Sequence, residues 1–337
     1  MNSRRTLGLC LVFAAGILYS TAGLFTRAIH LDAWTILAWR AVFGVLFLLV
    51  WMAVEKRGGL LQAFVLAPRD LALILPAALG GCCYILALKL TTVADVMVIY
   101  ATVPFVTMAI AWLWTREVPN GRMLAAAAAA LVGVAVMVAG GAGGGSRLAG
   151  IGMTLLMNIC FAINLVTARV SPGSTTAIFT VGTAVNGALA FALSPHPAVA
   201  SETLAVLAAF GVLTIGLAMA LYMTGARMIP PAEVGLVGIV DVVIGPVLVW
   251  WVFGENPGRS TVAGGVIVML ALLWHLLPDL KRLFGRHILA ESLFERGTPH
   301  DAAGSPAPDG GHETCAARRL ARPSVTDDVS GGGPHCG

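Results

Sequence analysis

Two charged side chains stand inside long apolar segments of this 337-residue chain. Arg40 lies in the run 33–53, and Asp241 lies in the run 232–253. A guanidinium in apolar surroundings can bind an anionic group such as a carboxylate, and a carboxylate can carry a proton or pair with an amine. Alternatively, the two side chains pair with each other or with backbone groups and hold helices together. The pattern therefore marks Arg40 and Asp241 as candidate binding residues and leaves a packing role open.

A second set of charges lies at the ends of apolar runs. KLTTVAD carries Lys89 and Asp95, and RMIPPAE carries Arg227 and Glu233 in the same arrangement. A carboxylate in the first turn of a helix is favoured by the helix dipole and can cap free N–H groups. The alternative is a gate, in which each carboxylate pairs with a basic residue at one mouth and releases it in another state. These four residues are the candidate gate residues.

Other polar side chains in apolar runs carry weaker signals. Glu117 and Glu255 follow helices, where the dipole disfavours an acid, so we expect a partner such as Arg122 or Arg259. Uncharged groups can line a cavity or bond between helices. Packing is the simpler interpretation of each one, but together they suggest an aromatic interior suited to an amphipathic small molecule. They include Asn158, Asn164, Asn186, Tyr19, Tyr84, Tyr100 and Tyr222.

The elements that must position these residues are membrane-spanning helices. The chain is 58% hydrophobic and 11% charged, with a mean hydropathy of +0.87, whereas soluble domains carry about 25% charged residues. A spanning helix needs about 20 mostly apolar residues. Such runs predict an all-α integral membrane protein with ten spans, the first of them a retained helix rather than a cleaved signal. The predicted spans are 7–26, 33–53, 71–89, 94–114, 123–141, 148–168, 175–193, 203–223, 232–253 and 261–278.

Several other classes of protein lack support in the sequence. The six cysteines form no CxxC, and GGAGGGS lacks the Gly-Lys-Ser/Thr ending of a phosphate loop. No basic cluster with interleaved aromatics indicates a nucleic-acid surface. An integral-membrane enzyme stays an alternative, but neither HxxxH nor GxSxG occurs; a receptor or scaffold without flux is the other alternative. We therefore expect no cofactor, no metal and no nucleic acid.

The Lys and Arg residues of the predicted loops set the expected orientation. If the N-terminus is cytoplasmic, twelve of these residues fall on the inside and four on the outside. The excess of positive charge then places both termini in the cytoplasm. From Leu289 onward the chain is rich in Gly, Pro, Asp, Ser and His, and we expect a disordered cytoplasmic tail over 289–337.

Two segments of the chain repeat one another at a shift of 138 residues, which aligns Lys89 with Arg227 and Asp95 with Glu233. Only five of the 31 residues over 89–119 are identical, so the signal is that rare residue types match without a gap. The other matches are Trp112 with Trp250, Glu117 with Glu255 and Pro119 with Pro257. A shift of 142 aligns Arg27 with Arg169. The chain thus divides into five-helix halves at 7–141 and 148–278, and because five is odd the second half must be inverted.

On these residues the chain resembles the drug/metabolite transporter superfamily, EamA type. The resemblance covers 7–278 and rests on ALKLTTVADVMVIYATVPFVTMAIAWLWTREVP in the first half and GARMIPPAEVGLVGIVDVVIGPVLVWWVFGENP in the second. It implies alternating access around a site near the membrane midplane. Family members move amino acids, other metabolites, sugars or drugs, often outward. One departure is that Pro104 has no counterpart at position 242, with Pro246 four residues later, so the two helices should kink at different depths.

The expected function is therefore that of a secondary transporter. It would export a small polar or amphipathic metabolite, driven by a proton gradient or by exchange because no Walker A motif is present. The expected partners are a small-molecule substrate and the lipid bilayer, and a homodimer is compatible with the sequence. The expected location is the inner membrane of the cell, as a multi-pass protein.

Overall fold

The computed structural model describes residues 3–55, 64, 68–116, 120–140, 144–170, 175–195, 197–229 and 231–296. Within these ranges it describes the backbone but not the side chains of residues 3, 68–69, 115, 167–170, 231–233, 235–239 and 278–296. Residues 1–285 form one unit, and residues 286–337 form a second.

The described residues contain helices and no strand. In a bilayer a helix satisfies all of its backbone hydrogen bonds within one segment, which suits the long apolar runs of this sequence. The helices are α1 (Ser3–Ser20), α2 (Ala22–Ala28), α3 (Ala33–Glu55), α5 (Pro68–Leu90), α6 (Val93–Tyr100), α7 (Val103–Thr115), α8 (Gly121–Ala139), α9 (Gly145–Val170), α10 (Thr175–Leu193), α11 (Ser201–Phe210), the π-helical η1 (Gly211–Leu217), α12 (Ala218–Ala226), α13 (Pro231–Phe253) and α14 (Arg259–Arg296).

Eight helices in the described part of the chain are long and apolar enough to cross a membrane, and the number is nine if α6 and α7 form one broken span. From α13 this count includes only the shorter apolar stretch Val240–Phe253. The prediction of an all-helical membrane protein is therefore confirmed. Ten spans with inverted halves stay a prediction.

Three predicted spans are interrupted. The run 7–26 breaks at Thr21, whose hydroxyl donates to the Leu18 carbonyl over 2.6 Å, and 203–223 contains η1. The run 94–114 breaks between α6 and α7, which meet at 40°. Pro104 lies in the first turn of α7, where a missing N–H is tolerated. Helix α13 continues through Pro246, so the expected difference between these two helices is confirmed.

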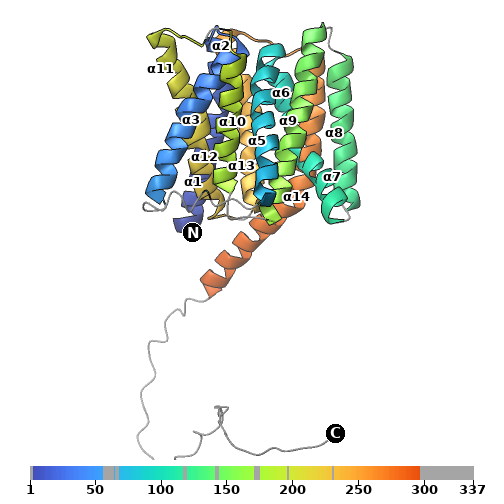
Figure 1. The fold of residues 1–337 in the computed structure, drawn as a ribbon. Coiled ribbons are helices and arrows are strands. Elements are labelled where there is room, and N and C mark those ends of the chain that lie inside the picture. The colour runs from blue at the N-terminus through green and yellow to red at the C-terminus, as the bar shows by residue number, and fades with distance from the viewer. Residues whose placement is uncertain are drawn as a thin grey trace, which may run out of the picture. The chain divides into compact units, whose positions relative to one another are not determined.

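The helices of the first unit lie side by side (Figure 1). Helix α5 packs between α9 and α10, α3 packs against α10 and η1, and α1 packs against α12 and α13. The core contains fully buried side chains from α3, α5, α6 and α11, including Ile36, Ile85, Leu88, Val96 and Phe210. These contacts put helices from the two halves of the sequence next to each other.

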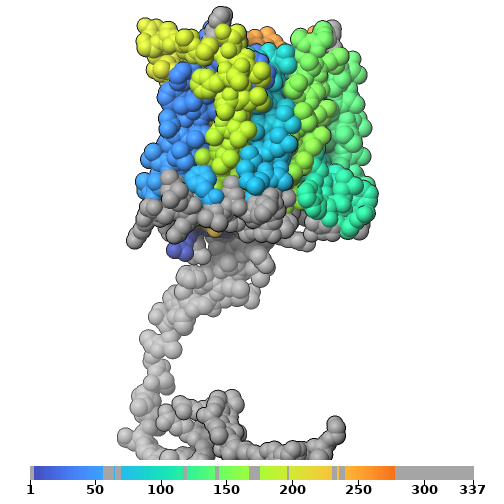
Figure 2. Space-filling view, viewed as in Figure 1, coloured from blue at the N-terminus to red at the C-terminus, as the bar shows by residue number. Residues whose placement is uncertain are grey.

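Large apolar side chains also cover the outside of the bundle. Val50 on α3, Leu131 on α8 and Trp251 on α13 are 65%, 70% and 80% exposed. Figure 2 shows the face on which α3, α10, α5 and α9 lie next to one another. Exposed apolar surface of this extent is expected where lipid rather than water surrounds a protein.

Helix α14 ends later than the sequence predicts. It continues to Arg296, past the predicted span 261–278. Residues 289–296 are therefore helical, and the prediction that they belong to a disordered tail is wrong. The rest of that predicted tail, 297–337, lies outside the described residues.

Candidate functional site

Arg40 lies in the interior of the bundle, on the buried side of α3, and is 8% exposed. Its guanidinium carbon lies 4.8 Å from the ring centroid of Phe210 and 5.8 Å from that of Tyr84. The Nε atom is buried and has no hydrogen-bond partner among the described residues. Aromatic faces offset part of the cost of burying the charge, and the guanidinium keeps donors for an anionic group.

Glycines hold α3 and η1 close together around Arg40. A Cβ atom on Gly211 would collide with the Arg40 carbonyl oxygen, and one on Gly44 would lie 2.6 Å from the Ile215 Cβ. On η1, Thr214 donates to the Phe210 carbonyl over 2.7 Å. A π-helical turn inside an α-helix is uncommon and often accompanies a functional site. Here it brings Phe210, the aromatic partner of Arg40, against α3.

Asp241 lies on α13 and is partly buried. Its Oδ1 atom is buried without a hydrogen-bond partner among the described residues. The Ser20 hydroxyl lies within reach of the carboxylate, although it donates to the Gly16 carbonyl over 2.8 Å. No ion pair joins Asp241 to Arg40 in the described part of the chain. Each therefore keeps hydrogen-bonding capacity that the protein does not use.

Tyrosines from four helices surround these two charges. Tyr19 on α1 lies close enough to interact electrostatically with Arg40, Asp241, Tyr84 and Tyr222. Tyr100 on α6 interacts with Asp241 and with the other three tyrosines, and its ring meets Phe161 edge to face at 6.2 Å. The aromatic interior predicted from the sequence thus forms around Arg40 and Asp241, with side chains from both halves of the chain.

The two asparagines predicted as binding candidates are bonded to helix backbone. Asn158 Nδ2 donates to the Ile99 carbonyl over 2.7 Å and contacts the Thr102 hydroxyl at 3.2 Å, at the break between α6 and α7. Asn164 Nδ2 donates to the Cys160 carbonyl of its own helix over 2.9 Å. Asn158 therefore stabilises the break in the span, while its Oδ1 has no described partner.

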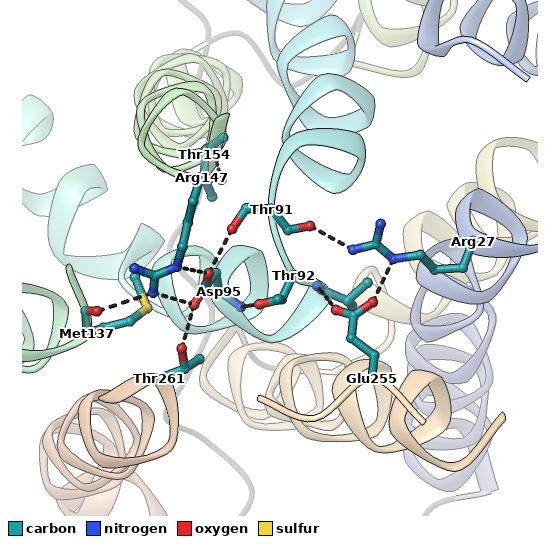
Figure 3. A network of polar contacts seen from close by, with 11 residues as sticks. Arg27, Thr91, Thr92, Asp95, Met137, Arg147, Thr154, Glu255 and Thr261 are labelled. Carbon is teal, nitrogen blue, oxygen red and sulfur yellow. Dashed lines mark hydrogen bonds and ion pairs between the residues drawn. The ribbon is translucent and has the colours of Figure 1, made fainter. Parts of the chain in front are cut away.

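Asp95 lies in a polar network at one end of the bundle (Figure 3). The carboxylate faces Arg147, with 2.9 Å from Nε to Oδ2 and 3.1 Å from Nη2 to Oδ1. The hydroxyls of Thr91 and Thr261 each donate to it over 2.7 Å. Asp95 is fully buried, so these four donors provide the compensation that a buried carboxylate needs. We call this end of the bundle the Asp95 end.

A second ion pair crosses the same end. Arg27, at the end of α2, lies 2.7 Å from Glu255, measured from Nε to Oε2. The other carboxylate oxygen accepts from the Val93 N–H over 2.8 Å, and Arg27 Nη2 donates to the Thr91 carbonyl over 2.7 Å. Glu255 therefore binds the start of α6 as well as the end of α2 (Figure 3).

The expected partners of the helix-end acids need correction. Glu255 pairs with Arg27 rather than with Arg122 or Arg259, because the end of α2 lies beside the end of α13. Arg122 instead donates to the Trp274 carbonyl and lies over the Trp274 ring at 4.9 Å. Glu117 lies outside the described residues.

The remaining gate candidates are placed as follows. Lys89 Nζ donates to the Ile29 carbonyl over 2.9 Å, just before α3 begins. Arg227 pairs with Glu55 at 2.8 Å, where α3 ends, and we call this opposite end the Glu55 end. Glu233 belongs to α13, but its side chain lies outside the described part. Exchange of ion pairs between two states stays a hypothesis.

Sequence reasoning missed Arg147, Thr261 and Arg27 as parts of a network. The two arginines carried a signal, because each lies at the end of an apolar run near an acid of the opposite half. Thr261 carried none: it is a single hydroxyl at the start of a helix, 166 residues from Asp95.

A hollow of about 350 Å³ lies between α2, α11, η1 and α13. Its lining includes Phe25, Leu213 and Phe253, with Thr21 as the one polar residue. Phe25 stacks on Phe210 at 5.0 Å. An apolar lining of this kind does not suit a polar substrate, so the polar interior around Arg40 is the better candidate site.

Comparison with known proteins agrees with this geometry. A family model described as the EamA-like transporter family matches residues 6–139 and 148–277. Among curated proteins, none matches. A solved structure titled "Crystal structure of protein" superposes with a TM-score of 0.58 at 17% identity, covering 81% of this chain and 98% of that one. That likeness concerns the fold alone.

Proposed function

This chain belongs to the EamA-like transporter family and is therefore a membrane transporter of the drug/metabolite type, and we propose that it exports a small polar metabolite by alternating access. The two family segments, 6–139 and 148–277, correspond to the halves inferred from the repeat. We propose that they form ten spans of inverted topology, with α13 as one complete span and both termini in the cytoplasm. The membrane is then the inner membrane of the cell.

The observation that carries the proposal is the unmatched pair of charges in the interior. Arg40 and Asp241 each keep a buried polar atom without a partner among the described residues. Burying an ionised group without compensation costs several kcal/mol. A transporter can tolerate this cost where a substrate or a proton completes the site in one step of its cycle.

The chemistry of the two groups suggests the substrate. The Arg40 guanidinium suits a carboxylate or another planar anion, because it presents its N–H donors in a fork. Asp241 suits a substrate amine, or it carries the coupling proton. The surrounding tyrosines offer aromatic faces and hydroxyls. A small molecule that carries both an anionic group and an amine fits this interior best, and coupling is by proton gradient or exchange.

The test compares small molecules in the medium and in the cytosol of cells that overexpress the chain and of cells that lack its gene. We expect a compound with both charges to move from cytosol to medium on overexpression and to accumulate inside when the gene is absent. No shift in any compound of this class, with the protein present in the membrane, would contradict the proposed substrate.

A further inference from the structure

Helix α9 passes unusually close to the turn between α5 and α6. A Cβ atom on Gly150 would lie 2.8 Å from the Thr91 Cβ and 3.1 Å from the Leu90 Cβ. Real Cβ atoms essentially never approach closer than 3.0 Å, so this contact requires glycine. Arg147 is three residues before Gly150 on α9, on the same side, and reaches Asp95 four residues after Thr91.

Helix α1 makes the same contact at the Glu55 end. A Cβ atom on Gly8 would lie 2.8 Å from the Met228 Cβ and 2.8 Å from the Ile229 Cγ2. The shift of 138 converts Leu90 and Thr91 into Met228 and Ile229, and the shift of 142 converts Gly8 into Gly150. The two contacts are therefore one contact made twice, once by each half of the chain against the other.

The match extends to the charged residues around each contact. Arg5 is three residues before Gly8, as Arg147 is three residues before Gly150. Glu233 is four residues after Ile229, as Asp95 is four residues after Thr91. Arg5 is partly buried, whereas the neighbouring Arg4 is exposed. Glu233 enters this comparison by its position in the sequence alone.

We propose that Arg5 holds the first turn of α13 through Glu233, as Arg147 holds the first turn of α6 through Asp95. Both glycine contacts are present in the same conformation. The two arginine pairs are therefore clamps that stand together and join the halves, rather than gates that exchange.

The two clamps differ in their support. Ile229 replaces Thr91, and prolines replace Thr92 and Val93, so the hydroxyls and the N–H of the Asp95 end are not repeated before α13. Asp95 accepts two hydroxyl hydrogen bonds besides its arginine. The Arg5 clamp has fewer donors in the sequence around it, so we expect it to depend more on its arginine.

This inference rests on the proposed inverted arrangement of the halves but not on transport. The test is a charge exchange in the purified full-length protein in detergent, read by its thermal unfolding midpoint. Arg5→Glu and Glu233→Arg should each lower the midpoint by several degrees, and the double variant should recover most of the loss. The matched control combines Arg4→Glu with Glu233→Arg and should recover nothing.

An exchanged pair no more stable than the sum of its single variants would overturn the clamp. If a charge reversal prevents folding, Arg5→Gln and Glu233→Gln are the milder variants, and their double variant should lose little more than either alone. Additive losses would equally overturn the proposal. Because the readout is stability, a failed transport assay would leave this result unaffected, and the reverse also holds.

Discussion

Arg147 and Asp95 form a two-point ion pair at one end of the bundle, with Nε to Oδ2 at 2.9 Å and Nη2 to Oδ1 at 3.1 Å. The carboxylate belongs to the first half of the chain, and the guanidinium belongs to the second. The pair therefore fastens α9 to the first turn of α6. Its side chains are 14% and 0% exposed, which makes it a buried pair.

Removing one partner of this pair should destabilise the protein strongly. Asp95→Asn and Arg147→Gln each leave an uncompensated buried group, for which losses of about 3–5 kcal/mol are typical. Arg147→Lys keeps the charge but loses the fork, so its effect should be intermediate. Denaturant unfolding of the purified protein in detergent measures these differences.

The matched control for this prediction is the exposed pair at the other end. Arg227 and Glu55 are 64% and 38% exposed, and pairs of this kind contribute about 0–1 kcal/mol. Arg227→Gln should therefore have little effect. Equal losses for Arg147→Gln and Arg227→Gln would show that burial does not determine the strength of the clamp.

The hydroxyls that donate to Asp95 should contribute to stability in their own right. Thr91→Val and Thr261→Val keep the shape of each side chain but remove its donor. Hydrogen bonds to a charged group contribute about 1.5–3 kcal/mol. Thr154→Val is the control, because Thr154 is equally buried but donates to the Gly150 carbonyl of its own helix. A loss no larger than that of the control would contradict this role.

The sequence predicted the positions of these elements better than their partners. The ends of α5, α6 and α13 follow from apolar runs and from the matched charges of the repeat. The partner of Asp95 could not be predicted, because Arg147 is 52 residues away and the rotation of α9 about its own axis decides which side it faces. Arg27 and Glu255 belong to different halves, so their proximity depends on how the halves pack.

The interior site was predicted in part, for the same physical reason. Charges in apolar runs are expensive, so Arg40 and Asp241 stood out by residue type alone. Asn158 looked similar in sequence, yet it bonds to the backbone at the break between α6 and α7. The π-helical turn against Arg40 could not be predicted either, because its glycines are also common in ordinary membrane helices.

Close packing between α3 and η1 should be sensitive to one added methyl group. Gly44→Ala would place a Cβ 2.6 Å from that of Ile215, and overpacking of this kind costs about 1–3 kcal/mol. Gly152→Ala on α9 is the control, since nothing lies within 4 Å of its added Cβ. Thermal unfolding in detergent should show a loss for Gly44→Ala only. Equal behaviour of the two variants would contradict the close contact.

The start of α3 should respond to acid. Partial burial opposes ionisation of Asp32, but hydrogen bonds from the Thr35 hydroxyl and from backbone N–H groups outweigh it, so the pKa of Asp32 lies below its usual value. A lowered pKa means that the stabilisation is present above the unfolded-state value of about 4 and is lost as the pH falls below it.

Asp32→Asn should therefore weaken this response to acid. The measurement compares the unfolding midpoints of the variant and the wild-type protein between neutral and acidic pH. The difference between them should shrink as the pH falls through the Asp32 pKa. A difference that stays constant over the whole range would contradict the assignment to Asp32.

The central claim is that Arg40 and Asp241 bind the transported molecule or its coupling proton. The most direct measurement is flux, in proteoliposomes with an imposed pH gradient, of the compound found by metabolite comparison, using the wild-type protein, Arg40→Gln and Asp241→Asn. We expect pH-dependent flux from the wild type, a loss of at least about tenfold for Arg40→Gln from one lost charged contact of about 1.5–3 kcal/mol, and no pH dependence for Asp241→Asn, with equal amounts of each variant inserted. Unchanged, pH-dependent flux in both variants would contradict the claim.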